Sequence, residues 1–221
     1  MIVQELISDT IPPMKSSDSA SMALTWMTEF KLNHLPIVDE GRYRGMITEN
    51  DILDAANPEA KLGEIRFAGR DSAYVFEGQH VYDAIDIMSN LKLELLPVLD
   101  EENRYLGVIT LRDIATHLSS LFATREPGSI IVLRIPHHGY VLSEIGQIVE
   151  SADVKVLSLY LSQHPSGLDM VLTLKLSAED PTRVRAAFER YRYEVLRTFY
   201  RNDNGEDLRS NLDALWRYLN F

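Results

Sequence analysis

Two short segments of the chain carry the same polar residues at the same spacing. GMITENDIL begins at residue 45 and GVITLRDIA begins at residue 107, and each places a threonine three residues before an aspartate: Thr48 and Asp51, then Thr110 and Asp113. A carboxylate accepts hydrogen bonds from the two hydroxyls of a diol, and the N–H groups at the start of a helix attract an anion. The pattern therefore favours two sites for a ligand that carries a diol and a phosphate.

The same residues also have a purely structural interpretation. A threonine with an acidic residue three positions later resembles a capping box, in which each side chain bonds the backbone N–H of the other residue. The box prefers Glu or Gln, whereas both segments have the shorter Asp, which we expect to reach the backbone less well and to leave its carboxylate free. Because the pattern occurs twice, we favour ligand binding over capping alone.

The residues around the two segments repeat as well. LPIVD at 35–39 matches LPVLD at 96–100, and Arg-Tyr precedes both segments. Pro97 follows Pro36 by 61 residues, whereas Asp113 follows Asp51 by 62, so the second copy has one extra residue, in the turn at 100–103. An internal repeat of this length indicates two copies of one supersecondary unit.

Hydrophobic spacing predicts the elements that position these segments. Each repeat is predicted to form a helix, two strands and a second helix. The expected ranges are 19–31, 35–38, 43–47 and 49–56 in the first repeat, and 81–91, 95–99, 105–109 and 111–122 in the second. Such a unit leaves one apolar sheet face that it cannot bury alone, so we expect the two repeats to pack together.

Composition argues against several classes of function. The chain has 221 residues, of which 45% are hydrophobic, enough for packed cores. A net charge of −11 gives no basic field for a nucleic acid or a membrane. The absence of cysteine removes disulfides and thiolate chemistry. No leader-like segment and no apolar run near the roughly 20 residues that span a bilayer are present, so we expect a cytoplasmic protein.

The sequence contains no familiar motif for catalysis or for a metal site. It lacks the Gly-x-Ser-x-Gly, Walker, His-Glu-x-x-His and Gly-x-Gly-x-x-Gly patterns. His137, His138 and His164 have no carboxylate at ligand spacing. His34, at a strand entrance, is expected to be solvent-facing or hydrogen-bonded within the protein. We therefore predict no enzyme activity, no metal and no cofactor.

The paired pattern resembles a tandem of cystathionine-β-synthase (CBS) domains, also called a Bateman module, over about residues 3–124. The resemblance implies an adenosine-containing ligand (AMP, ADP, ATP or S-adenosylmethionine) in clefts between the repeats, with the threonines near phosphate and the aspartates on the ribose hydroxyls. The full set of candidate ligand-binding residues is Thr48, Asp51, Thr110, Asp113, Arg112, Pro36, Pro97, Thr10 and Pro12.

The two candidate sites differ in charge. Between the threonine and the aspartate the first segment has Glu49 and Asn50, whereas the second has Leu111 and Arg112. Two unit charges about 6 Å apart interact by roughly 3 kcal/mol at an effective dielectric constant near 20, before solvent screening. We therefore expect the second segment to hold phosphate better.

A different pattern begins after residue 128. Strands are predicted at 129–135, 154–161, 169–176 and 193–200, with helices at 141–152 and after Asp180-Pro181. The order βαββαβ is a ferredoxin-like split unit. It resembles an ACT domain, which implies a regulatory module that commonly dimerises and in some relatives binds amino acids. His137-His138 stand where an acidic residue and proline are common in that family, which leaves amino-acid binding open.

A last amphipathic segment, 206–221, is predicted to be helical. Its apolar stripe consists of Leu208, Leu212, Leu215, Trp216 and Leu219. The sequence leaves two alternatives open, because the stripe can pack against its own domain or against a partner subunit.

These observations predict an α/β (α+β) fold in three parts: a first CBS repeat over 1–61, a second over 62–124, and an ACT-like domain with a C-terminal helix over 128–221. The expected function is a non-catalytic regulatory protein that senses an adenosine-containing ligand. The alternative is a structural or dimerisation scaffold with no bound nucleotide. We also expect a homodimer and a regulated partner protein that the sequence does not identify.

Overall fold

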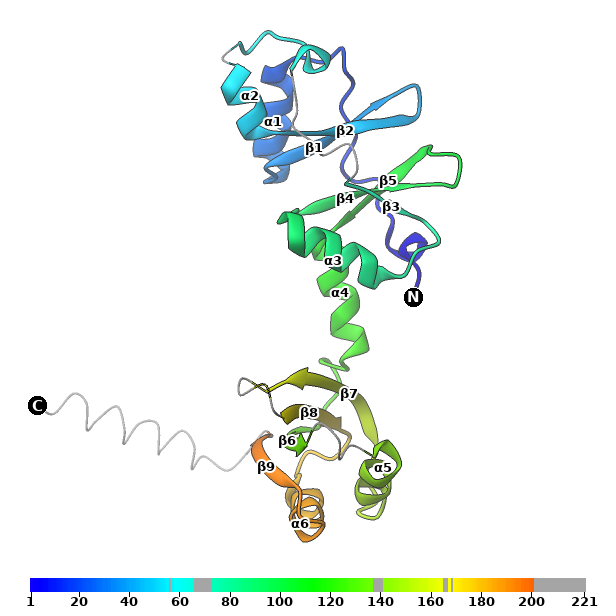
Figure 1. Ribbon diagram of the computed structural model, residues 1–221, viewed down its shortest axis with the longest axis vertical. Coiled ribbons are helices and arrows are strands. Elements are labelled where there is room, and N and C mark those ends of the chain that lie inside the picture. The colour runs from blue at the N-terminus through cyan, green and yellow to red at the C-terminus, as the bar shows by residue number, and fades with distance from the viewer. Residues whose placement is uncertain (56, 66–72, 137–140, 165–166, 168, 201–221) are drawn as a thin grey trace, which may run out of the picture. The chain divides into compact units, whose positions relative to one another are not determined.

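The computed structural model describes residues 1–55, 57–65, 73–136, 141–164, 167 and 169–200. The chain divides into two compact units, Met1–His117 and Leu118–Phe221. Figure 1 shows the elements of each unit, and the two units are described separately below.

The first repeat forms the predicted elements in the predicted order. Ser19 caps α1 by accepting a hydrogen bond from the Met22 amide at 3.2 Å, and Lys31 ends the helix in the left-handed conformation. Glu40 and Gly41 both have positive φ, as a tight two-residue hairpin requires. The elements are a 3₁₀ turn η1 (Val3–Leu6), α1 (Ala20–Phe30), β1 (His34–Asp39), β2 (Arg42–Thr48) and α2 (Glu49–Ala55).

The second repeat follows the same plan, with one strand that the sequence did not reveal. This strand, β3, has only two residues and pairs in parallel with β4. In the first repeat Met14 makes the corresponding parallel bridge to Ile37. The elements are η2 (Leu62–Glu64), β3 (Val75–Phe76), α3 (Val81–Leu91), β4 (Leu95–Leu99), β5 (Tyr105–Thr110) and α4 (Leu111–Leu121).

The two repeats pack against each other where β1 and β4 begin, as expected from their apolar strands. The ring nitrogen Nε2 of His34 lies 3.3 Å from both the amide nitrogen and the carbonyl oxygen of Leu95. The Asn33 amide donates to the Glu94 carboxylate at 3.2 Å. His34 is 3% exposed, so it is the hydrogen-bonded residue that the sequence allowed and not a solvent-facing one.

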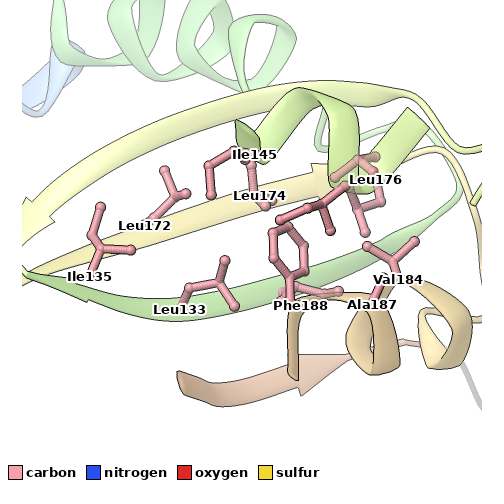
Figure 2. Close-up of a cluster of buried hydrophobic side chains, with 12 residues drawn as sticks. Leu133, Ile135, Ile145, Leu172, Leu174, Leu176, Val184, Ala187 and Phe188 are labelled. Atoms are coloured by element: carbon pink, nitrogen blue, oxygen red, sulfur yellow. The ribbon is translucent and has the colours of Figure 1, made fainter. Parts of the chain in front are cut away.

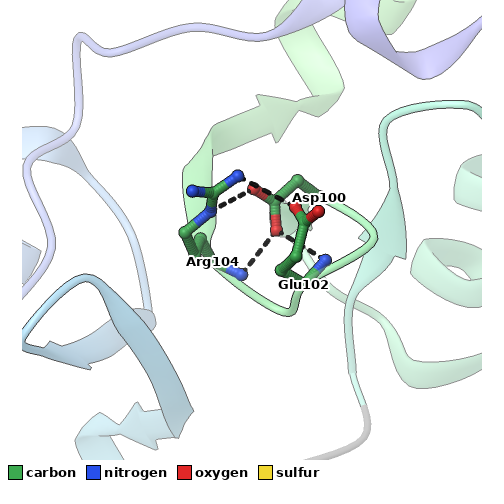
Figure 3. A network of polar contacts seen from close by, with 3 residues as sticks. All are labelled: Asp100, Glu102 and Arg104. Carbon is green, nitrogen blue, oxygen red and sulfur yellow. Dashed lines mark hydrogen bonds and ion pairs between the residues drawn. The ribbon is translucent and has the colours of Figure 1, made fainter.

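The extra residue of the second repeat lies in a turn that Asp100 stabilises. Its carboxylate accepts hydrogen bonds from the Glu102 amide at 3.0 Å, the Arg104 amide at 2.7 Å and the Arg104 Nε at 2.6 Å (Figure 3). In the first repeat, Asp39 accepts instead from the hydroxyl and the amide of Ser16. The matching aspartates therefore accept hydrogen bonds from different donors: Asp100 from its own turn, and Asp39 from Ser16 in the segment before α1.

These two aspartates predict a loss of stability in acid. The Ser16 hydroxyl and amide lower the pKa of Asp39; burial raises the pKa of Asp100, but the Arg104 bonds outweigh it and leave the pKa lowered. Carboxylates with a lowered pKa stabilise the folded state above their unfolded pKa, about 3.9, and lose this contribution as the pH falls through the folded pKa.

We expect the free energy of unfolding, measured with urea, to fall as the pH is lowered from about 5 to 3, across the unfolded pKa of Asp. An Asp100→Asn variant lacks one of the two titrating groups, so it should lose less stability over the same range. Equal losses in the parent and in the variant would show that Asp100 does not contribute.

The C-terminal unit has the predicted βαββαβ order and the sheet order β7-β8-β6-β9, with every neighbouring pair antiparallel. This arrangement confirms the ferredoxin-like, ACT-like fold. Two boundaries differ from the prediction. The helix expected at 141–152 is shorter, and the strand expected at 154–161 lies two residues later. The elements are β6 (Ser129–Pro136), α5 (Leu142–Glu150), β7 (Val156–Gln163), β8 (Asp169–Leu176), α6 (Thr182–Arg190) and β9 (Glu194–Phe199).

The core of this unit lies between the sheet and its two helices. Figure 2 shows alternate side chains of β6 and β8 meeting side chains of α5 and α6. Phe188 is fully buried at the centre of this contact. The segments around His137-His138 and 206–221, including the predicted C-terminal helix, lie outside the described residues.

Candidate functional site

The first candidate segment lies at a strand-to-helix junction, as predicted. Thr48 is the last residue of β2 and Glu49 is the first residue of α2. The Oδ2 atom of Asp51 accepts hydrogen bonds from the Thr48 amide at 2.9 Å and from the Thr48 hydroxyl at 2.5 Å. The Asp51 amide in turn donates to the Thr48 hydroxyl oxygen at 3.2 Å. The four-residue segment is thus a closed capping box.

The second segment has the same geometry. The Oδ2 atom of Asp113 accepts from the Thr110 amide at 3.0 Å and from its hydroxyl at 2.6 Å, while the Asp113 amide donates to Thr110 Oγ1 at 3.2 Å. The expectation that aspartate would reach the backbone poorly was wrong. In both repeats the threonine hydroxyl helps to close the short box, because it donates to the aspartate carboxylate and accepts a hydrogen bond from the aspartate amide.

The closed boxes change what each site offers to a ligand. Within the described part of the chain, Oδ1 of each aspartate accepts no hydrogen bond, and both aspartates are only partly exposed. The carboxylate therefore presents one available oxygen, where the sequence suggested two. A single carboxylate oxygen still has two lone pairs and accepts bonds from two adjacent hydroxyls.

The helix starts also have fewer available N–H groups than expected. The Leu111 amide donates to the Glu94 carbonyl at 2.9 Å, and the Glu49 amide donates to the Asn33 carbonyl at 3.0 Å. Since the capping boxes use the threonine and aspartate amides, the Asn50 and Arg112 amides are the first-turn donors without an acceptor among the described residues. An anion would therefore depend on cationic side chains as much as on the backbone.

A cleft of about 360 Å³ opens beside the first segment. Its walls come from both repeats, because Thr48 and Asn50 face the residues that follow α3. Lys92 stands there in the left-handed conformation that ends the helix. The cleft is lined by Asn33, His34, Thr48, Glu49, Asn50, Leu91, Lys92 and Leu93.

Lys92 is a candidate residue that the sequence analysis missed. The available signal was the repeat itself, since Lys92 follows Lys31 by the same 61 residues that separate Pro36 and Pro97. Lys92 lines the same cleft as Glu49, so the other repeat supplies a cation to the first site. The predicted charge difference between the two sites is therefore smaller than the segments alone suggest, although Arg112 is exposed on α4.

The candidates Thr10 and Pro12 belong to the first repeat by sequence, but the segment that carries them reaches the second repeat. Ser8 forms an antiparallel bridge with Val108, with N–O distances of 2.8 and 3.1 Å. The Thr10 hydroxyl lies 2.8 Å from the Ser8 hydroxyl. The leading segment thus runs alongside the strand that ends at Thr110.

Gly107 makes this crossing possible. Its φ is +151°, and a Cβ atom at this position would lie 2.7 Å from Ile7 Cγ2 and 2.9 Å from the Ser8 carbonyl oxygen. Only glycine lets the leading segment approach so closely. The glycine of the repeated phrase is therefore required by the contact between the repeats.

The candidates Pro36 and Pro97 are buried, Pro36 in β1 and Pro97 in β4. Pro36 pairs with Met46 in the β1–β2 ladder, and Pro97 pairs with Val108 in the β4–β5 ladder. The Pro36 carbonyl also accepts from the Met14 amide at 2.8 Å. Their observed contacts are those of the sheet, and a role in ligand binding stays a prediction.

The described residues contain neither a cluster of metal ligands nor a membrane-spanning helix. No group of three or more His, Asp or Glu side chains in the described ranges is arranged to hold a metal ion. None of the helices in that part of the chain is both long and apolar enough to cross a bilayer.

The N-terminal half of the chain matches a known protein family. The model of the CBS domain family matches residues 3–57 and again 62–120, which together are half of the chain. The two matches coincide with the two repeats.

Curated relatives match the same half. Inosine-5'-monophosphate dehydrogenase of Methanocaldococcus jannaschii is 29% identical over 111 residues, which are 50% of this chain and 22% of that enzyme. Homoserine O-acetyltransferase of Methanosarcina acetivorans is 26% identical over 117 residues, 52% of this chain and 21% of that enzyme. An uncharacterised 17.7 kDa protein of Acidianus ambivalens is 30% identical over 118 residues and is covered to 72%. The chain thus spans about a fifth of the two enzymes.

Solved structures are similar over the same share of the chain. A CBS domain pair/ACT domain protein from Thermotoga maritima is 23% identical, with a TM-score of 0.48, over 53% of this chain and 96% of that one. CBSX2 in complex with AMP is 19% identical, with a TM-score of 0.45, over 53% and 95%. A CBS domain pair in complex with 5'-methylthioadenosine and S-adenosyl-L-methionine is 31% identical, with a TM-score of 0.43, over 54% and 96%.

Proposed function

Because the chain belongs to the CBS domain family, we propose that its pair of repeats binds an adenosine-containing ligand and that the protein is a non-catalytic regulator. The observation that carries the proposal is the pair of identical Thr–Asp boxes, each of which leaves one carboxylate oxygen available at a strand-to-helix junction.

Each residue of the second site has a defined part in this proposal. Asp113 Oδ1 accepts bonds from the ribose hydroxyls, while its Oδ2 stays bound to Thr110. The Arg112 amide and guanidinium are both donors, and they lie at the positive end of α4, where an anion is stabilised. At the first site, Asp51 has the same part and Lys92 supplies the cation.

Ligand binding should raise the melting temperature of the protein. A ligand at about 100 times its dissociation constant stabilises the folded state by roughly 2.7 kcal/mol. We expect a shift of several degrees with at least one of AMP, ADP, ATP and S-adenosylmethionine, measured by differential scanning fluorimetry. If none of these compounds at millimolar concentration shifts the melting temperature, the sensing function is excluded.

A structural scaffold with empty clefts is the second candidate function. It is favoured by the closed capping boxes, which stabilise the helices without any ligand. The purified protein distinguishes the two, because a bound nucleotide that survives purification appears as absorbance near 260 nm after denaturation and filtration.

We expect the protein to form a homodimer. Large apolar side chains of the first unit are exposed on its helices, among them Met22, Leu53 and Leu91 at 40%, 60% and 47%. Burying such side chains against a second copy removes apolar surface from water. Light scattering at micromolar concentration should give about twice the 25.2 kDa of one chain, and a value of one chain would contradict the prediction.

A further inference from the structure

Among the described elements of the C-terminal unit, the two helices α5 and α6 cover the same face of the sheet. Alternate side chains of β6 and β8 are fully buried beneath α5 and α6 (Figure 2): Ile131, Leu133 and Ile135 on β6, and Leu172, Leu174 and Leu176 on β8. Successive side chains of a strand point to opposite faces, so the residues between them lie on the other face. Ile130, Val132 and Val171 there are only half-buried.

Strand pairing arranges that second face in rows. One row crosses all four strands through Tyr160, Thr173, Val132 and Arg197. The rows on either side of it are Ser158, Lys175, Ile130 and Phe199, and Ser162, Val171, Arg134 and Glu194. Val132 and the short Thr173 stand in the middle row, with the apolar Ile130 and Val171 in the rows beside it, and the same rows also contain four charged residues: Lys175, Arg134, Arg197 and Glu194. We call these twelve residues the open face.

Two contacts join the segment after α4 to the open face. The Phe122 ring meets the Tyr160 ring edge-on at 5.4 Å, and the Phe122 carbonyl accepts from the Ser158 hydroxyl at 3.1 Å. Both contacts are on β7. On the side toward β9, Phe199 is 51% exposed when only the described residues are considered.

We propose that the chain's own segment 206–221 covers the open face, with Leu208, Leu212, Leu215, Trp216 and Leu219 turned toward β8, β6 and β9. The stripe repeats at helical spacing, and the face it would meet carries Ile130, Val132 and Val171, which the described residues leave only half-buried. The sequence allowed packing on the same domain or on a partner subunit, and the open face favours the first.

The lengths agree with this arrangement. A helix of 16 residues is about 24 Å long, and four strands spaced by about 4.8 Å span roughly 14 Å from one edge to the other. The segment follows β9, an edge strand of the sheet, with residues 200–205 as the connection. A six-residue connection reaches up to about 20 Å, so the stripe needs no second copy of the chain to reach the centre of the face.

The other apolar surface of this unit is a poorer match. A groove of about 590 Å³ lies between α5 and β7 and is lined by Gly146, Lys155 and Val156 among others. It is on the helix side of the sheet, and β7 is the edge strand farthest from β9. A segment that leaves from β9 would have to cross the whole sheet to fill it.

The tryptophan in the stripe provides the first test. The chain has two tryptophans, so a full-length Trp26→Phe variant reports Trp216 alone. We expect a blue-shifted Trp216 emission that does not change on dilution and that moves to the red when Val132 is replaced by Asp. An Ala186→Asp control, on the exposed side of α6, should leave the emission unchanged.

Disulfide trapping then identifies which segment covers the open face. Because the chain has no cysteine of its own, only the introduced cysteines can form a disulfide. Under mild oxidation, Thr173→Cys combined with Leu212→Cys or with Leu215→Cys should give a disulfide within one chain, whereas Ala186→Cys combined with either should not. A disulfide between chains would overturn the proposal in favour of a second copy. The emission of a fully exposed Trp216, or equal trapping at Thr173 and Ala186, would overturn it as well.

Discussion

Replacing Asp113 with alanine is expected to weaken nucleotide binding by about 10- to 100-fold, because hydrogen bonds to a charged group contribute roughly 1.5–3 kcal/mol. The variant loses the only available carboxylate oxygen of the second site. Isothermal titration calorimetry with the nucleotide that shifts the melting temperature most measures the effect. Asp51→Ala should leave a substantial part of the binding. The negative charge of Glu49 beside Thr48 disfavours phosphate at the first site, so we expect that site to contribute less.

Asp113→Ala also opens the capping box of α4, which costs about 1 kcal/mol of stability. Melting curves without ligand therefore need to accompany the titrations. Asp86→Ala, on the exposed side of α3, removes the same charge far from both capping boxes and should bind like the parent. If Asp113→Ala is harmless and Asp51→Ala abolishes binding, the principal site is the cleft beside Lys92.

Gly128→Ala is expected to be the most destabilising small substitution in the C-terminal unit. Gly128 has a φ of +142°, and a Cβ atom there would lie 1.9 Å from the Leu176 carbonyl oxygen. Backbone strain of about 1–3 kcal/mol and overpacking of about 1–3 kcal/mol together predict a loss of about 2–6 kcal/mol. Urea unfolding followed by circular dichroism measures this loss.

Gly146→Ala in the same unit is the matched control. Gly146 is inside α5, and a Cβ atom there meets nothing within 4 Å. Alanine in a helix interior is favoured over glycine by about 0.5–1 kcal/mol, so this variant should be slightly more stable than the parent. Two losses of similar size would show that the close approach of Gly128 to Leu176 does not determine the effect.

The sequence alone determined the repeat, the order of nearly all the elements and the position of the candidate sites. These features depend on local information: α3, β4 and β8 begin and end at the predicted residues because periodicity and turn residues mark them. The Thr–Asp segments were placed at strand-to-helix junctions for the same reason. The two-residue strand β3 was missed because it has no periodicity of its own and exists only through pairing with β4.

The tertiary structure decided what the sites contain. The leading segment reaches the second repeat through the bridge from Ser8 to Val108, and Lys92 enters the first cleft from the other repeat. Both contacts join residues far apart in the sequence, so no local pattern encodes them. The free oxygen of each aspartate has a more local origin, because its bonds to the threonine three residues earlier occupy Oδ2 and leave Oδ1 available for a ligand.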